Sequence, residues 1–191
     1  TPEDLQEHEA LFKTASMLFI DANLSEKTLH KTFSLARKAR VPVCADPTSS
    51  TLAERLRDHL SKLYLITPNS TEAGILTGLS FESSERKTTI EAARFLVNQG
   101  VQIALVTLAE FGVCYATSET TGHISAIRTK IIDPTGTGDA LTAAIIFALL
   151  NDIPLDDAIR LGVSAASLTL RYPGTVYPDL SLEKLYDQLL I

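Results

Sequence analysis

Short apolar runs alternate with segments of helical period along this chain, and this alternation limits the fold more than any other feature. Residues 17–21, 41–45 and 63–67 form apolar runs typical of buried strands, and residues 25–40 between the first two have a helical period. Parallel strands need such connections, which then cover the sheet. The pattern predicts an α/β fold, with a mostly parallel sheet and helices on both faces, as one domain over residues 1–191.

The rest of the chain continues this pattern and adds a hairpin. A helix follows the third strand, with caps expected at Ser70 or Thr71 and at Gly78. Further along, the sequence predicts strands over 101–107, 112–117 and 122–131 and helices over 88–98, 139–150, 155–170 and 181–190. Ser-Glu-Thr-Thr between the last two strands favours an antiparallel hairpin. The helix that begins at Asp139 is almost continuously apolar, so it should be buried on most sides.

One predicted helix, 155–170, contains a stretch of small residues formed by Gly162, Ala165, Ala166 and Ser167. Small side chains allow either a neighbouring helix or a flat ligand to approach this helix closely. The residues alone leave both possibilities open.

Composition favours a small-molecule partner. The chain has 191 residues and a formal net charge of −6, which disfavours nucleic acid or an anionic membrane surface because either would want a basic face. Apolar stretches stay shorter than the roughly 18 residues of a membrane helix, and we expect a cytoplasmic protein. Its two cysteines, Cys44 and Cys114, lie in apolar runs and should be buried reduced thiols.

The glycine-rich run from Asp133 to Asp139 carries the clearest chemistry. Gly136, Thr137 and Gly138 precede an apolar helix, where glycines let backbone N–H groups converge and the helix dipole adds positive potential. Such an anion hole can stabilise a transferring phosphoryl group, with Asp139 as general base for the acceptor hydroxyl. A tight turn with Asp139 as a cap is the alternative.

Two other nucleotide-binding motifs do not fit this run. The dinucleotide fingerprint needs a third glycine, but Leu141 occupies that place, and Asp156 begins a helix instead of ending a strand. The P-loop pattern is absent from the sequence. A dehydrogenase and a P-loop enzyme are therefore disfavoured.

A second group of polar residues follows the predicted strands. Asn69 and Glu72 are three residues apart at a helix start, so both can face one cleft and hold a hydrated Mg²⁺. A capped helix with a solvated Glu72 is equally compatible with the pattern. Asp46 follows another strand and either contacts a ligand or makes a local turn.

These motifs together resemble the ribokinase-type (PfkB) carbohydrate and nucleoside kinases. The run Asp-Pro-Thr-Gly-Thr-Gly-Asp-Ala-Leu, 133–141, resembles their C-terminal signature, and Thr-Pro-Asn-x-x-Glu, 67–72, resembles their N-x-x-E motif. The resemblance implies a ribokinase-like three-layer α/β/α fold and ATP with Mg²⁺ as cofactors. It implies Asp139 as catalytic base, an anion hole at Gly136, Thr137 and Gly138, and Asn69 with Glu72 arranging Mg²⁺ through water.

The resemblance also implies a nucleotide site and a cation site. Residues 107–112 lie where the family has its nucleotide-binding T-L-G-S-K-G segment; Thr107 and Gly112 fit it, whereas Ala109, Glu110 and Phe111 depart from it. The implied adenine contacts are Val163 and Ala166. A monovalent cation near Asp133 and Thr135 is found in several members, but Pro178 replaces a serine ligand of ribokinases.

Three flanking segments, residues 21–25, 41–49 and 178–181, are most similar to pseudouridine kinases within this family. This similarity implies phosphorylation of pseudouridine to pseudouridine 5′-phosphate. The alternatives are a ribokinase-type sugar kinase of other specificity and a non-catalytic nucleotide-binding fragment. Family members carry about a hundred further residues before this point, so we expect a C-terminal portion without the N-terminal units and lid. The expected partner is a small sugar or nucleoside, and the sequence leaves a homo-oligomer open.

Overall fold

The computed structural model describes residues 1–79 and 85–190, and these fall into two compact units. The first unit takes its residues from Thr1–Leu108 and Cys114–Gly122, and the second from Ala109–Val113 and His123–Ile191. The single domain over residues 1–191 stays a prediction.

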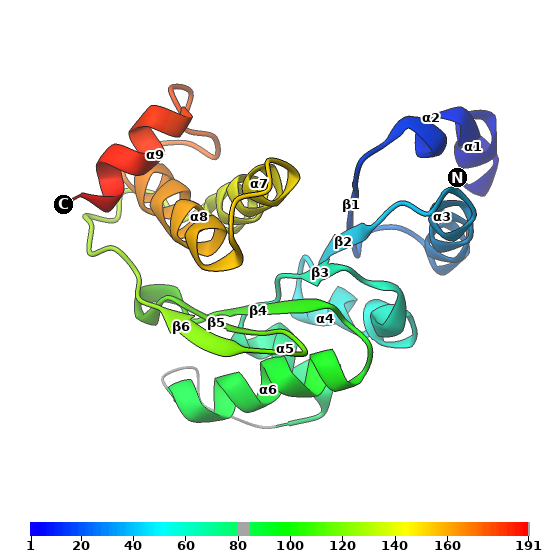
Figure 1. The fold of residues 1–191 in the computed structure, drawn as a ribbon, viewed down its shortest axis with the longest axis horizontal. Helices are drawn as coiled ribbons and strands as arrows, with labels where there is room; N and C mark the ends of the chain where they lie inside the picture. Colours follow the sequence, from blue (N-terminus) through cyan, green and yellow to red (C-terminus); the bar gives the residue numbers. More distant parts are fainter. Residues whose placement is uncertain (80–84, 191) are drawn as a thin grey trace. The chain divides into compact units, whose positions relative to one another are not determined.

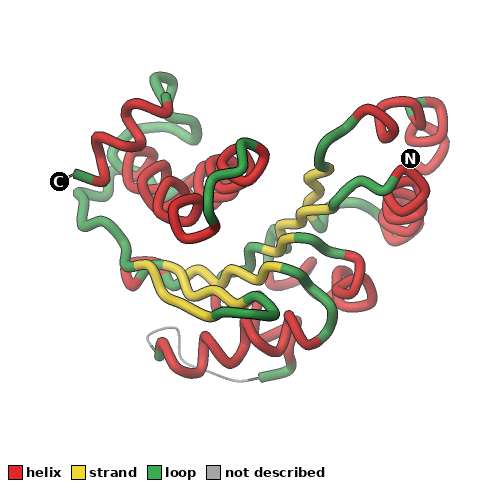
Figure 2. The backbone as a smooth tube through the Cα atoms, in the orientation of Figure 1, coloured by secondary structure: helices red, strands yellow, loops and turns green. Residues whose placement is uncertain are grey.

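A mixed sheet organises the strands in the order β1-β2-β3-β4-β5-β6 (Figures 1 and 2). The strands are β1 (Leu18–Asp21), β2 (Val43–Asp46), β3 (Leu65–Ile66), β4 (Ile103–Thr107), β5 (Val113–Ala116) and β6 (Thr121–Ile124). The first four are parallel, with Leu18 opposite Val43 and Leu65 opposite Ile103, whereas β4 to β6 run antiparallel. The predicted parallel sheet with a terminal hairpin is confirmed.

The first unit buries its strands because their residues are apolar on both faces. All residues of β2 except Asp46 and all of β4 except Thr107 are buried, the pattern of a sheet covered on two sides. Ile66, Ala104 and Val106 join one apolar core with Leu29, Phe33 and other helix residues. Full burial of a side chain such as Leu29 contributes about 1.5–3 kcal/mol.

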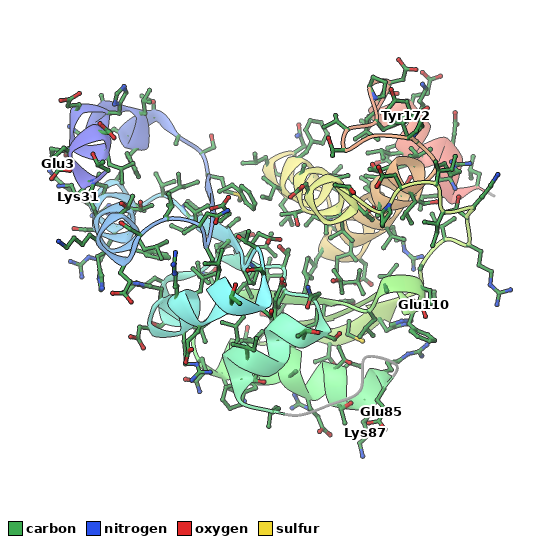
Figure 3. All side chains as sticks on the ribbon, turned by 180° about the vertical axis from the view of Figure 1, so that it is seen from behind. Glu3, Lys31, Glu85, Lys87, Glu110 and Tyr172 are labelled. Atoms are coloured by element: carbon green, nitrogen blue, oxygen red, sulfur yellow. The ribbon has the colours of Figure 1, made fainter. Side chains whose placement is uncertain are left out.

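Helices of the first unit pack their apolar stripes on this core. They are α1 (Pro2–Glu7), α2 (Glu9–Thr14), α3 (Glu26–Ala39), α4 (Ser50–Ala53), the 3-10 helix η1 (Glu54–Lys62), α5 (Ser70–Thr77) and α6 (Arg86–Asn98). Ser25 caps α3 by accepting a hydrogen bond from the Thr28 N–H. Lys38 of α3 pairs with Glu9 at 2.6 Å, and Figure 3 shows Glu3 and Lys31 on the neighbouring helices α1 and α3.

The second unit contains the 3-10 helix η2 (Ala109–Phe111) and three helices, α7 (Thr137–Leu150), α8 (Leu155–Leu170) and α9 (Leu182–Leu189). A Cβ at Gly162 of α8 would come within 2.6 Å of Ile145 Cγ1 on α7, so the helices meet closely there. Ser164 Oγ donates to the Leu185 carbonyl at 2.7 Å and ties α9 to α8. Packing against a helix therefore accounts for the small residue at 162.

The structure corrects three sequence predictions. The strand predicted over 122–131 ends at Ile124, since the residues beyond it find no strand partner within the described part of the chain. The helix after β3 is capped by Asn69 and not by Ser70 or Thr71, although Gly78 ends it as predicted. The helix predicted over 139–150 leaves Phe147 and others on an exposed face, so it is not buried on most sides.

None of the helices in the described ranges combines the length and the apolar character that crossing a membrane requires.

Candidate functional site

The carboxyl ends of β2, β3 and β4 bring polar residues to one edge of the sheet. Asp46 is the last residue of β2, and the Thr67 hydroxyl just after β3 donates to its Oδ2 at 3.2 Å. Thr107 ends β4, where its N–H donates to the Pro68 carbonyl at 2.9 Å and its backbone bridges to Asn69. Ligands of open α/β sheets bind at this edge. The candidate site residues of the first unit therefore lie where a ligand can bind.

Asn69 and Glu72 form a reciprocal capping box at the start of α5. The Glu72 N–H donates to Asn69 Oδ1 at 3.0 Å, and the Asn69 N–H donates to Glu72 Oε2 at 2.9 Å. Asn69 is exposed, whereas Glu72 is only 5% exposed, so the alternative of a solvated Glu72 is wrong although its cap is real. Burial raises the pKa of Glu72, and the nearby Asp46 carboxylate raises it further.

The donor set at this edge fits a hydrated Mg²⁺. Mg²⁺ prefers oxygen ligands and commonly keeps several waters, using one or two carboxylates together with phosphates. Asp46 and Glu72 supply two carboxylates whose mutual repulsion a cation would relieve, and Asn69 is exposed beside Glu72 although its Oδ1 accepts the Glu72 N–H. The described residues contain no cluster of three or more metal-ligating side chains of the His, Cys, Asp and Glu types.

In the second unit, residues 133–136 form a tight turn that opens α7. The Thr135 N–H donates to Asp133 Oδ1 at 2.9 Å, and hydrogen bonding by Thr135 lowers the pKa of Asp133. Gly136 is the N-cap of α7 with φ of +78°, a conformation that favours glycine. A Cβ there would lie 1.9 Å from the Thr175 carbonyl oxygen, so Gly136 is also required by close backbone packing.

The first turn of α7 has open space and polar groups without partners. A Cβ on Gly138 would meet nothing within 4 Å, and Asp139 is exposed. The N–H groups of Gly138 and Asp139 have no backbone acceptor among the described residues, as expected for a helix start. Thr137 Oγ1 is buried without a hydrogen-bond partner in the described part of the chain. Free donors and an orphaned hydroxyl in one turn suit a phosphoryl group.

The residues implied for nucleotide binding are divided between the units. Thr107 belongs to the first unit, whereas Gly112, Val163 and Ala166 belong to the second. Gly112 has φ of +100°, and a Cβ on it would lie 2.1 Å from the Ile124 carbonyl oxygen. Backbone packing therefore requires glycine at position 112, independently of any nucleotide contact. Val163 and Ala166 are buried on α8.

The local turn that the sequence offered as one reading of Asp46 is present, since the Thr48 N–H donates to Asp46 Oδ1 at 2.7 Å. Sequence reasoning missed the close approach of Thr175 to Gly136. Nothing in the residues near Thr175 specifies that approach.

Comparisons with known proteins identify the family of this chain. A family model for pfkB family carbohydrate kinases matches residues 1–181. Pseudouridine kinase of Escherichia coli K12 is 30% identical over 183 residues, which are 95% of this chain and 57% of that protein. Ribokinase of Haemophilus influenzae is 33% identical over 141 residues, 73% of this chain and 44% of that protein.

A solved structure shows the same fold. Arabidopsis thaliana ribokinase, complexed with ribose and ATP, superposes with a TM-score of 0.82 at 24% identity, covering 97% of this chain and 59% of that chain. The ribokinase-like α/β fold is therefore confirmed. The chain spans about half the length of the proteins that it matches.

Proposed function

Because this chain belongs to the pfkB family of carbohydrate kinases, we propose that it carries the phosphoryl-transfer residues of an ATP-dependent sugar or nucleoside kinase. The observation that carries the proposal is the start of α7. There, unpartnered N–H groups, the orphaned Thr137 hydroxyl and the exposed Asp139 carboxylate lie within one helical turn. Donors for a developing negative charge next to a base are what phosphoryl transfer needs.

Asp139 acts on the acceptor hydroxyl in this mechanism. Its carboxylate accepts the hydroxyl proton as that oxygen forms a bond to the γ-phosphorus and the bond to the β-phosphate oxygen breaks. The N–H groups of Gly138 and Asp139 and the hydroxyl of Thr137 stabilise the charge on the transferring group. ATP would supply the phosphoryl group. Asn69 and Glu72 would hold Mg²⁺ through water, and the metal would neutralise part of the charge on the phosphates.

Pseudouridine is the acceptor that we propose first. It is supported by the 30% identity to pseudouridine kinase over almost the whole chain, while a ribokinase at 33% over a shorter segment supports the wider sugar-kinase class. Full-length protein would be assayed with ATP against pseudouridine, uridine, ribose and fructose 6-phosphate. Turnover of pseudouridine above the others is expected. A well-folded protein that turns over none of the four would overturn the kinase proposal.

The Asp139→Asn variant of the full-length protein is expected to lose at least about 10²-fold in kcat, because the acceptor proton then lacks a base. Asp157→Asn is the matched control, since Asp157 is also an exposed aspartate in the first turn of a helix. Steady-state kinetics with the best acceptor measure both. Equal, small losses in the two variants would reduce Asp139 to a helix-dipole partner.

A non-catalytic nucleotide-binding role is the second candidate, favoured by Glu110. This exposed carboxylate lies on η2 (Figure 3), within the segment that resembles the family's nucleotide-binding loop, where negative charge opposes phosphates. Calorimetric titration of the 191-residue chain with Mg-ATP, followed by a turnover assay of the full-length protein, separates the candidates. Binding without turnover in both proteins supports the second candidate and contradicts the first.

A further inference from the structure

A pocket of about 470 Å³ lies within the first unit, apart from the sheet edge described above. Its walls come from α3, the start of β2 and the end of η1, including Phe33, Val41 and Lys62. Val43 lines the pocket at the amino end of β2, whereas Asp46 at the carboxyl end belongs to the candidate magnesium site. Three residues of strand separate them by about 10 Å. The volume is that of an ordinary small-ligand site.

One face of α3 forms the main wall of this pocket. His30, Phe33, Ser34 and Arg37 are spaced by three or four residues, so they lie along one side of the helix. Phe33 is buried and belongs to the core, whereas His30, Ser34 and Arg37 are exposed. The helix therefore presents a basic and hydroxyl-bearing rim above an apolar floor.

Lys62 is held in place on the opposite wall. Its Nζ donates to His59 Nδ1 at 2.8 Å and lies 5.5 Å from the centre of the Phe33 ring. His59 stacks on Phe33 with ring centres 4.5 Å apart, and His30 meets His59 edge-on at 4.8 Å. Burial lowers the pKa of His59, which keeps Nδ1 available as an acceptor for Lys62. The lysine is thus preorganised for binding.

The basic groups of this rim lack acidic partners. Arg37 and Lys62 form no salt bridge within the described residues, and the Arg37 guanidinium makes no hydrogen bond there. Asp58 is the carboxylate whose charge reaches His59, and it does not line the pocket. An uncompensated cluster of a guanidinium and an ammonium attracts an anion, and the planar guanidinium suits a phosphate.

We propose that this pocket binds a sugar phosphate. Arg37, Lys62 and His30 hold the phosphate group. Ser34 and Ser61, exposed serines on the pocket wall with no hydrogen bond from their hydroxyls in the described part of the chain, pair with the sugar hydroxyls. A phosphate ion alone would leave most of the volume unfilled. The proposal stands independently of the kinase function, because it uses none of the residues at α5 or α7.

Ribose 5-phosphate is the probe, titrated into the 191-residue chain and followed by calorimetry and by the ring signals of its four histidines. Saturable binding is expected to shift His30, which lines the pocket, and His59, which contacts Lys62. His8 and His123 do not line the pocket and should stay unchanged. Ribose and inorganic phosphate should each bind at least about 10-fold more weakly, since each lacks half of the contacts.

Variants locate the binding charges. Arg37→Ala and Lys62→Met are each expected to weaken ribose 5-phosphate binding by about 10-fold, the usual effect of losing one charged hydrogen bond. Lys27→Ala is the matched control, since it removes an exposed cation of α3 outside the pocket and should change affinity less than about twofold. Binding that survives the double Arg37→Ala, Lys62→Met change, or that shifts neither His30 nor His59, overturns the proposal. Equal affinity for inorganic phosphate also overturns it.

Discussion

At the scale of single residues, two glycines of the same loop have opposite surroundings. Gly136 has a positive φ and faces the Thr175 backbone, whereas Gly138 faces open space. The proposed anion hole therefore combines one glycine required by the fold with another that leaves room for a ligand. The sequence alone does not distinguish the two glycines, because the clash at Gly136 involves a residue almost forty positions away.

Alanine substitution separates the two glycines. Gly136→Ala is expected to lower the free energy of unfolding by about 2 kcal/mol or more, through strained φ and a backbone clash. Gly138→Ala should leave stability unchanged or raise it by up to about 1 kcal/mol, because alanine favours helix. Chemical denaturation of the 191-residue chain measures both. Similar losses in the two variants would contradict the packing described for Gly136.

Glu72 gives a prediction about pH. Its raised pKa means that the folded state holds the proton more tightly than the unfolded chain, so ionisation costs stability as pH rises from about 4.5 through the folded-state pKa. Glu72→Gln keeps the capping box without the charge, because glutamine also serves at this position. Its stability relative to the wild type should therefore increase over that pH window.

Unfolding free energies measured from pH 4 to pH 8 test this. Glu72→Ala is the control for the cap and should be about 1 kcal/mol less stable than Glu72→Gln at every pH, since the Asn69 N–H then has no acceptor. Parallel curves for the wild type and Glu72→Gln would show that burial does not raise the pKa of Glu72.

At the scale of elements, α7 and α8 make the most extensive helix contact in the described part of the chain. The sequence predicted both helices well, including the end of α8 at Leu170, because apolar periodicity and Pro154 mark them. It left open what the small residues of α8 approach. At Gly162 the neighbour that approaches is Ile145. The sequence could not show this, because the contact depends on how the two helices pack.

Gly162→Ala is expected to destabilise the chain by about 1–3 kcal/mol, because the new methyl group would overlap Ile145 and come 3.0 Å from the Leu141 carbonyl oxygen. Ile145→Ala in the same chain should restore part of the loss by making room. A double-mutant cycle measured by thermal unfolding gives the coupling between the two sites. Additive effects would mean that the helices move apart without cost.

At the scale of the whole molecule, the family could be recognised from two motifs, and the match over residues 1–181 confirms it. The mixed sheet was also predictable, since the four parallel strands have apolar runs and a turn-forming segment separates the last two strands. Exact caps and the end of β6 were not, because Asn69 competes with two other capping residues and the segment after Ile124 is rich in β-branched residues without having a strand partner in the described part of the chain. The acceptor stays a proposal, since relatives of different specificity match to a similar extent.

The path of the chain through β5 and β6 has a consequence for anyone who wishes to recombine this protein. The backbone passes from one unit to the other after Leu108, after Val113 and after Gly122, so the second unit is not one continuous stretch. A gene fragment starting at His123 would omit Gly112, whose backbone packs against Ile124. Exchanging the segment around α7 between homologues therefore requires the hairpin to travel with it, and a breakpoint before Ala109 keeps Gly112 and Ile124 in the same fragment.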